Sequence, residues 1–153
     1  MSFKKVKPIT ILMADDDEDD RLLAQDALAE SRVINDLHFV EDGVELLEYL
    51  ERRGKYEDKE LSPRPGLILL DLNMPRMDGR EALQAIKANA NLKGIPVVIL
   101  TTSKQEEDMV RGYDLGAASY ITKPVTFDGL VELMKTLGKY WVEFVELPST
   151  FND

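Results

Sequence analysis

Five short apolar runs alternate along this chain with segments in which apolar residues recur at every third or fourth position. The runs are mostly continuous, are rich in Ile, Leu and Val, and cover residues 9–14, 37–40, 67–70, 97–100 and 118–122. Continuous runs of this length are typical of strands that are buried on both faces of a parallel sheet. Because a helical pattern separates each run from the next, the sequence predicts βαβ units with right-handed crossovers. The expected fold class is α/β, a (βα)5 doubly wound parallel five-stranded sheet.

The segments between the runs predict which helix faces pack on the sheet. Apolar residues at helical spacing are Leu23, Ala27 and Leu28, then Val44, Leu47 and Leu50, then Ala82, Leu83 and Ile86, and finally Met109, Val110 and Tyr113. Asp-Gly pairs at 42–43 and 78–79 mark the ends of elements. Thr126 is expected to cap the N-terminus of the last helix.

The length of 153 residues favours one domain. We expect an N-terminal tail over residues 1–8, a globular domain over 9–147 and a C-terminal tail over 148–153. Residues 54–66 are polar, contain two prolines and predict a long surface loop before the third strand. The last helix is expected over about 126–146.

Composition excludes several kinds of site. The chain has no Cys and a single His, His38, which excludes disulfides, thiolate zinc sites and cysteine nucleophiles and argues against a Ser-His-Asp triad. The net charge of −10 argues against direct nucleic-acid binding, which needs clustered Lys and Arg. No stretch approaches the roughly 20 apolar residues of a membrane-spanning helix. We therefore expect a cytoplasmic protein that binds neither nucleic acid nor membranes.

The last helical segment has apolar residues around more of its circumference than a helix needs to pack on one face of a sheet. Either the end of the chain folds back and covers this surface, or the surface forms a homodimer. The candidate dimer residues are Leu133, Leu137, Tyr140, Trp141 and Phe144.

Acidic, hydroxyl and amine side chains follow four of the predicted strands. Asp15 and Asp16 come after the first strand, Asp71 after the third, Thr101 after the fourth and Lys123 after the fifth. In a doubly wound sheet these positions meet at the carboxyl edge, where ligands bind. Clustered carboxylates resist ionisation unless positive charge lies among them, and one lysine does not balance three acids. Oxygen ligands without His or Cys favour Mg²⁺, with Mn²⁺ or Ca²⁺ able to substitute. Residues 17–20 are expected instead to cap the first helix.

In these four positions the chain resembles the receiver domain of two-component response regulators, whose topology is flavodoxin-like. Thr101 lies 30 residues after Asp71, and Lys123 lies 22 residues after Thr101, spacings that are usual in that family. The resemblance covers residues 9 to about 137. It implies that Asp71 accepts a phosphoryl group from a histidine kinase in a Mg²⁺-dependent reaction and becomes a 4-aspartylphosphate.

The resemblance also implies a role for each residue around Asp71. Asp16 and Asp71 would ligate Mg²⁺ directly, the backbone carbonyl of Asn73 would be the third protein ligand, and Asp15 would act through water. Lys123 would contact a phosphoryl oxygen, Thr101 would hydrogen-bond the phosphoryl group, and Tyr120 would rotate inward with Thr101. Asn73 and Ser103 occupy the positions that tune dephosphorylation, and the Lys123–Pro124 peptide bond would be cis.

The long loop at 54–66 and the aromatic segment at 140–148 are similar to those of single-domain phytochrome-associated response regulators. This second resemblance implies a stand-alone dimeric receiver without an output domain and a phytochrome as the cognate kinase. The signal would then leave through protein contacts with a downstream target that the sequence does not identify.

Two other functions are compatible with the same acidic edge. One is a Mg²⁺-dependent phosphatase with an Asp nucleophile, although such an enzyme normally needs a second acid two residues further on, where this chain has Asn73. The other is a binding scaffold that is never phosphorylated, which the complete set of Asp16, Asp71, Thr101 and Lys123 disfavours.

Overall fold

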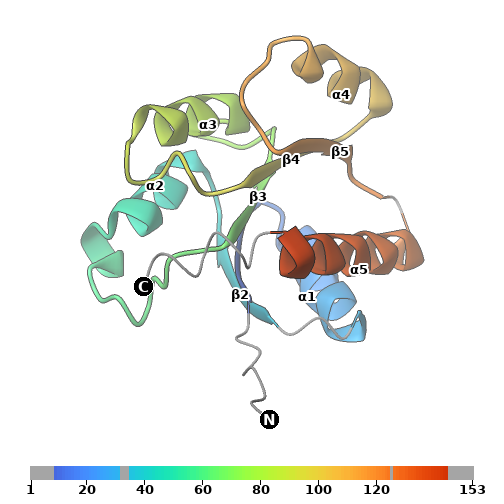
Figure 1. Cartoon of the computed structure of the whole chain (residues 1–153), viewed down its shortest axis with the longest axis horizontal. Coiled ribbons are helices and arrows are strands. Elements are labelled where there is room, and N and C mark those ends of the chain that lie inside the picture. Colours follow the sequence, from blue (N-terminus) through green and yellow to red (C-terminus); the bar gives the residue numbers. More distant parts are fainter. Residues whose placement is uncertain (1–8, 32–34, 125, 145–153) are drawn as a thin grey trace.

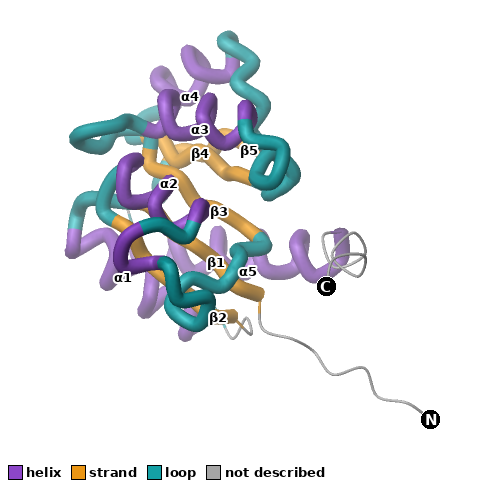
Figure 2. The backbone as a smooth tube through the Cα atoms, turned by 90° about the vertical axis from the view of Figure 1, so that its left-hand side faces the viewer, coloured by secondary structure: helices purple, strands orange, loops and turns teal. Residues whose placement is uncertain are grey.

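A computed structural model describes residues 9–31, 35–124 and 126–144. Five parallel strands form one sheet in the order β2-β1-β3-β4-β5, with helices on both faces (Figures 1 and 2). The strands are β1 (Ile9–Ala14), β2 (Asn35–Val40), β3 (Leu67–Asp71), β4 (Val97–Thr101) and β5 (Ser119–Thr122). The predicted α/β fold class is therefore confirmed. The bounds of the predicted runs agree with those of the strands to within one residue, except that β2 begins two residues before its run.

Five helices connect and follow the strands. They are α1 (Glu18–Glu30), α2 (Gly43–Glu51), α3 (Gly79–Ala88), α4 (Lys104–Arg111) and α5 (Phe127–Phe144), with a 3₁₀ turn η1 at Gly54–Tyr56. In Figure 1, α1 and α5 cover one face of the sheet, and α2, α3 and α4 cover the other. None of the helices in the described ranges is long and apolar enough to span a membrane.

The core is divided by the sheet into two apolar layers. The first contains Leu12, Leu46, Ile68, Leu83 and Ile99, with α2 and α3 packed on it. The second lies beneath α1 and α5. Its members are buried residues of the other strand face and of those two helices: Ile11, Met13, Ala24, Ala27, Leu28, Leu67, Leu69, Val98, Leu100, Val131, Met134 and Leu137. Burial on both faces explains why β3 and β4 are buried at every position and read as continuous apolar runs.

Three of the predicted helix faces need correction. In α1, Leu23 is 45% exposed, whereas Ala27 and Leu28 are buried. Of the fourth predicted set, Met109 and Tyr113 are more than half exposed, and only Val110 is buried. In α2 the fully buried residues are Leu46 and Tyr49 rather than the predicted set, which is only half buried. These helices are short, and several overlapping stripes fit their apolar residues. The predicted face of α3 is confirmed, since Ala82, Leu83 and Ile86 are all fully buried.

Polar side chains fix where the helices begin. Asp17 accepts hydrogen bonds from the N–H groups of residues 19 and 20, and Asp42, Asp78 and Ser103 cap α2, α3 and α4 in the same manner. The predicted cap of the last helix is confirmed, because the Gly129 N–H donates to the Thr126 hydroxyl at 3.0 Å. Capped helix starts place the strand-to-helix turns at fixed positions beside the carboxyl edge.

The 54–66 segment begins with η1, forms no other helix or strand before β3, and is anchored to the domain by side chains. The Tyr49 hydroxyl donates to the Pro63 carbonyl at 2.8 Å. Ser62 is buried, and its hydroxyl lies 2.8 Å from the Tyr56 carbonyl oxygen. Tyr56 in turn packs on Tyr49 and donates to Glu45 at 2.7 Å.

The last helix, α5, runs from Phe127 to Phe144, where the described part of the chain ends. Leu137, a candidate dimer residue, is only 7% exposed and belongs to the core beneath α5, so its side chain is covered within the protomer. Leu133 is half buried against the same core. The side chains of Tyr140, Trp141 and Phe144 lie outside the described residues, as do both predicted tails.

Candidate functional site

The parallel register brings the ends of β1, β3, β4 and β5 to one edge of the sheet. Ala14 is opposite Leu70, Asp71 is opposite Leu100, and Thr101 is opposite Thr122. The carboxyl ends of these four strands therefore lie along one rim of the sheet. Backbone hydrogen bonds continue past the strands, from the Lys123 N–H to the Thr101 carbonyl at 2.8 Å and from the Asp15 N–H to the Val40 carbonyl at 3.0 Å.

Three carboxylates meet at this rim. Asp15, Asp16 and Asp71 each offer one oxygen, and these oxygens lie within 4.8 Å of one another. Asp15 is fully buried and Asp71 is 4% exposed, whereas Asp16 faces solvent. The predicted acidic cluster is therefore brought together from β1 and β3, with one side open.

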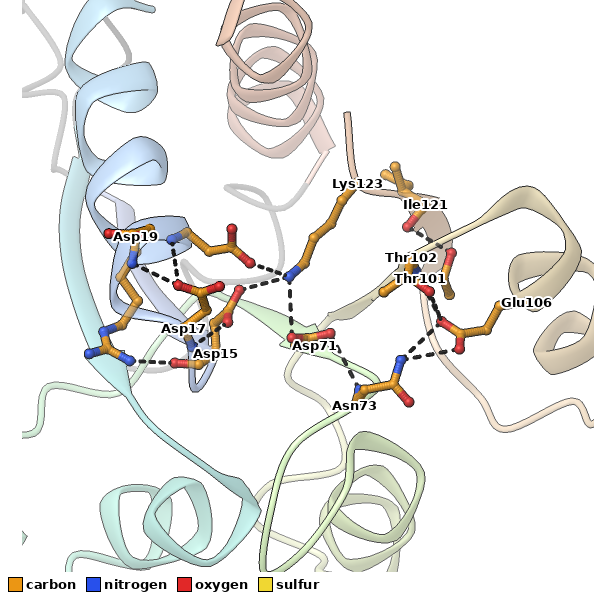
Figure 3. Close-up of polar contacts among 12 residues, drawn as sticks. Asp15, Asp17, Asp19, Asp71, Asn73, Thr101, Thr102, Glu106, Ile121 and Lys123 are labelled. Carbon is orange, nitrogen blue, oxygen red and sulfur yellow. Dashed lines mark hydrogen bonds and ion pairs between the residues drawn. The ribbon is translucent and has the colours of Figure 1, made fainter. Parts of the chain in front are cut away.

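Lys123 reaches into this cluster from the end of β5 (Figure 3). Its Nζ lies 2.9 Å from Asp15 Oδ2 and 3.2 Å from Asp71 Oδ2. It also lies 2.8 Å from Asp20 Oδ2 on the first turn of α1. The sequence reasoning assigned Asp20 only to helix capping, so this third contact was missed. Asp20 is in the first turn of α1, where an acid fits helix capping equally well, so no separate sequence signal marked this contact.

The buried carboxylates hold their protons more tightly than exposed ones. Burial raises the pKa of Asp71 to about 6, although the Lys123 ammonium acts to lower it. Burial also raises the pKa of Asp15, against a hydrogen bond from the Asp17 N–H and the contact with Lys123. Burial acts to lower the pKa of Lys123, but its hydrogen bonds to Asp20 and Asp15 outweigh burial and raise it. The cluster thus holds more negative charge than one ammonium neutralises.

This surplus of negative charge fits a divalent cation. The donors are all carboxylate oxygens, which hard cations such as Mg²⁺ prefer, and the exposed Asp16 leaves a side through which a hydrated ion can enter. Asp15, Asp16 and Asp71 could each supply one ligand atom.

The Thr101 hydroxyl is held by groups of β5 and of the β4–α4 turn. It lies 3.2 Å from the Ser103 carbonyl, 3.5 Å from the Ile121 carbonyl and 3.4 Å from the Thr122 hydroxyl. Thr101 is fully buried. The predicted residue is therefore at the expected strand end, with its hydroxyl engaged on the β5 side of the rim.

Glu107 on α4 is a buried carboxylate that sequence reasoning missed. It accepts from the Thr122 N–H at 2.9 Å and from the Thr122 hydroxyl at 3.1 Å. Lys104 and Arg111 form ion pairs with its other oxygen. Hydrogen bonding from Lys104 and the other donors lowers the pKa of Glu107 to about 2. Because an ionised carboxylate only accepts, Glu107 directs the Thr122 proton away from Thr101 and leaves the Thr122 oxygen as an acceptor.

Tyr120 lies inside the protein in this structure. It is 8% exposed, and its hydroxyl accepts from the Leu115 N–H at 3.2 Å. Arg111 lies over its ring and donates to its carbonyl at 2.6 Å. Tyr120 is thus buried while the Thr101 hydroxyl is engaged by groups of β5 and of the β4–α4 turn.

Asn73 and Glu106 connect the loop after β3 to the start of α4, on the β4 side of Asp71 (Figure 3). The Asn73 N–H donates to Asp71 Oδ1 at 3.3 Å, and its side-chain amide donates to the Glu106 carboxylate at 3.1 Å. The Thr102 N–H donates to the same carboxylate at 3.0 Å. Ser103 caps α4 through its hydroxyl, which accepts from the Glu106 N–H at 3.1 Å. Glu106 was not among the predicted site residues.

The Lys123–Pro124 peptide bond is trans, since the described residues contain no cis peptide bond. The expected cis bond is therefore wrong for this structure. The trans isomer is the intrinsically favoured form of X–Pro bonds by roughly 0.5–1 kcal/mol.

Comparison with known proteins gives a consistent result. The family described as "Response regulator receiver domain" matches residues 11–135. The chain is 41% identical to "Response regulator Rcp1" of Synechocystis sp. (strain ATCC 27184 / PCC 6803 / Kazusa), over 97% of this chain and 99% of that protein.

Solved structures with the same fold include two relatives at 41% identity. The phosphorylated cyanobacterial phytochrome response regulator RcpA matches with a TM-score of 0.78, over 89% of this chain and 95% of that one. The Mn²⁺-bound form of response regulator Rcp1 matches with a TM-score of 0.75, over 90% and 96%.

Proposed function

The chain belongs to the response regulator receiver family, and from this membership we propose that it accepts a phosphoryl group from a sensor histidine kinase on Asp71. The observation that carries the proposal is the meeting of Asp15, Asp16 and Asp71 with Lys123 at one edge of the sheet. Phosphorylation would then change the contacts that the chain makes with other proteins.

Asp71 is the nucleophile in this reaction. A carboxylate oxygen forms a bond to phosphorus while the bond from phosphorus to the imidazole nitrogen of the donor's phosphohistidine breaks, and the leaving imidazole takes up a proton. Asp71 is suited to this role because it ends β3 close to the exposed Asp16 and one of its oxygens, Oδ2, is held by Lys123. The product is a 4-aspartylphosphate.

Asp16 and Asp71 would hold the divalent cation directly, with the Asn73 carbonyl as the third protein ligand and Asp15 acting through water. When bound, Mg²⁺ supplies positive charge that reduces repulsion between the carboxylate and the phosphoryl oxygens. Mn²⁺ is a suitable substitute, and a relative with the same fold is known in a Mn²⁺-bound form.

Lys123 and Thr101 would recognise the phosphoryl group once it is attached. The Lys123 ammonium already lies 3.2 Å from Asp71 and is held there by Asp15 and Asp20. Thr101 would exchange its present acceptors for a phosphoryl oxygen, and Tyr120 would support the new position of the loop. Asn73 and Ser103 border the same rim and would set how fast water removes the phosphoryl group.

We propose a phytochrome as the kinase partner. The support is the identity of 41% with a cyanobacterial phytochrome response regulator, which covers nearly all of that chain. A homodimer formed through the apolar end of α5, a cytoplasmic location and a downstream protein target belong to the same proposal.

A phosphatase that acts on external substrates is a weaker candidate. Its acid–base step needs a second acid two residues after the nucleophile, and Asn73 occupies that position with its amide on Glu106. A scaffold that is never phosphorylated would leave the buried, charge-repelling Asp15 and Asp71 without a purpose.

The test is incubation with acetyl phosphate and Mg²⁺, followed by intact mass and phosphate release. We expect the mass of one added phosphoryl group, absent in Asp71→Asn and absent with EDTA. Sustained phosphate release far above one per chain would support the phosphatase. No adduct with either donor, acetyl phosphate or a phosphorylated histidine kinase, would support the scaffold.

A further inference from the structure

Glu106, in the first turn of α4, places a carboxylate on the β4 side of the acidic edge, across Asp71 from Asp15 (Figure 3). This side chain accepts hydrogen bonds from three donors: the Thr102 N–H at 3.0 Å, the Thr102 hydroxyl at 3.3 Å and the Asn73 amide at 3.1 Å. The donors come from the loops that follow β3 and β4 (Figure 3). Glu106 thus connects the two loops that flank the phosphoryl acceptor.

The donors that Glu106 occupies are those that an incoming anion would meet. Asn73 is two residues after Asp71 and donates its own N–H to Asp71. Thr102 directly follows Thr101, the residue opposite Thr122 in the β4–β5 pairing. Backbone N–H groups and amides next to a nucleophile are the usual donors to oxyanions in group transfer. In this structure they donate to a carboxylate of the chain itself.

The negative charge of Glu106, like its hydrogen bonds, opposes the approach of an anionic phosphoryl donor. Asp15, Asp16, Asp20 and Asp71 already surround the site, and Lys123 is bonded to three of them. A further carboxylate on the β4 side of Asp71 adds to the repulsion of an anionic phosphoryl donor.

We propose that Glu106 is a positioning residue for phosphoryl transfer, which holds the Thr102 and Asn73 donors in the unphosphorylated chain and releases them when phosphoryl oxygens arrive. The inference rests on the proposed function, because it presupposes that Asp71 is phosphorylated. Its consequence is that Glu106 slows phosphorylation by small anionic donors and weakens the binding of phosphoryl analogues.

The test compares Glu106→Gln and Glu106→Ala with Asp108→Asn. Asp108 is on the same helix and is exposed, and its change removes the same charge without touching Thr102 or Asn73. We expect both Glu106 variants to be phosphorylated by acetyl phosphate about three- to tenfold faster than wild type, the rate equivalent of the net contribution of one ordinary hydrogen bond. Asp108→Asn should stay within about twofold of wild type.

A second measurement separates this role from helix capping. Titration with beryllofluoride and Mg²⁺, followed by amide NMR, should show tighter binding in the Glu106 variants, and the Thr102 amide should already be shifted before titration. If Glu106 only caps α4, the variants would melt at lower temperature with no gain in rate or affinity, and the inference would be overturned. Failure of wild type itself to form an aspartyl phosphate would instead overturn the proposed function.

Discussion

At the scale of single residues, the buried carboxylate of Asp71 at the acidic edge lowers the free energy of unfolding. Asp71 is buried beside Asp15, and burial raises its pKa to about 6. Above that pH the folded protein contains an ionised carboxylate that the unfolded chain would solvate more favourably, so this residue lowers the free energy of unfolding.

Asp71→Asn should therefore stabilise the metal-free protein. We expect the free energy of unfolding to rise by about 1 kcal/mol or more at pH 7.5 in EDTA, because the variant removes the buried charge. The gain should shrink as the pH falls from about 6 to 4, where wild-type Asp71 takes up a proton. Urea unfolding at several pH values measures this, and a variant less stable than wild type at pH 7.5 would show that Lys123 stabilises Asp71 more than burial destabilises it.

Glu107 should show the opposite dependence on pH. Its pKa lies at about 2 in the folded protein and near 4.5 in an unfolded chain, so its stabilising effect is present above about pH 5 and is lost as the pH falls toward 2. We expect Glu107→Gln to lower the free energy of unfolding by about 1–3 kcal/mol at pH 7, since the Thr122 N–H keeps a weaker acceptor.

The difference in the free energy of unfolding between wild type and Glu107→Gln should become smaller as the pH falls from 5 to 2. The exposed neighbour Asp108 is the control, and Asp108→Asn should change stability by less than about 0.5 kcal/mol. A difference that is independent of pH would mean that Glu107 acts through packing rather than charge.

At the scale of elements, the site depends on how closely α3 approaches the end of β3. A Cβ added at Gly79 would lie 2.6 Å from the Asp71 carbonyl oxygen and 2.9 Å from the Leu72 Cα, both backbone atoms. The Gly79 N–H also donates to the Leu72 carbonyl at 2.9 Å. The start of α3 therefore fixes the backbone that carries Asp71.

Gly79→Ala should shift this backbone. We expect a loss of about 1–3 kcal/mol in the free energy of unfolding, the usual cost of overpacking, together with slower phosphorylation of Asp71. Gly94→Ala is the matched control, because a Cβ there meets no atom within 4 Å, and it should be neutral in both assays. A fully active and stable Gly79→Ala would show that α3 can move without disturbing the acceptor.

The strands and the acceptor edge could be predicted from the sequence for a physical reason. Strands buried on both faces need continuous apolar runs, and parallel pairing brings their ends to one edge, so Asp71 and Lys123 could be placed together. The contacts of Asp20, Glu106 and Glu107 were missed because they join separate elements, and their sequence positions fit ordinary capping or exposed helix faces equally well. Leu23 and Met109 were misplaced because overlapping apolar stripes on short helices do not identify the buried face.

At the scale of the whole molecule, the end of α5 is the proposed homodimer surface. Leu137 is buried in its own protomer, so Leu137→Ala should lower the free energy of unfolding by roughly 2–5 kcal/mol. Trp141→Ser and Phe144→Ser should instead dissociate the dimer and leave a folded monomer. Analytical ultracentrifugation at micromolar concentration distinguishes these results, and a monomeric wild type, phosphorylated or not, would contradict the proposed dimer.

The most direct measurement is to locate the phosphoryl group on the chain. Borohydride reduces an aspartyl phosphate to homoserine, so the reduced protein can be digested and sequenced by mass spectrometry. After treatment with acetyl phosphate and Mg²⁺, we predict homoserine at position 71 alone, and unmodified Asp71 when EDTA is present. Homoserine at Asp15, Asp16 or another acid, or reduction at Asp71 that is independent of Mg²⁺, would contradict Asp71 as the metal-dependent acceptor.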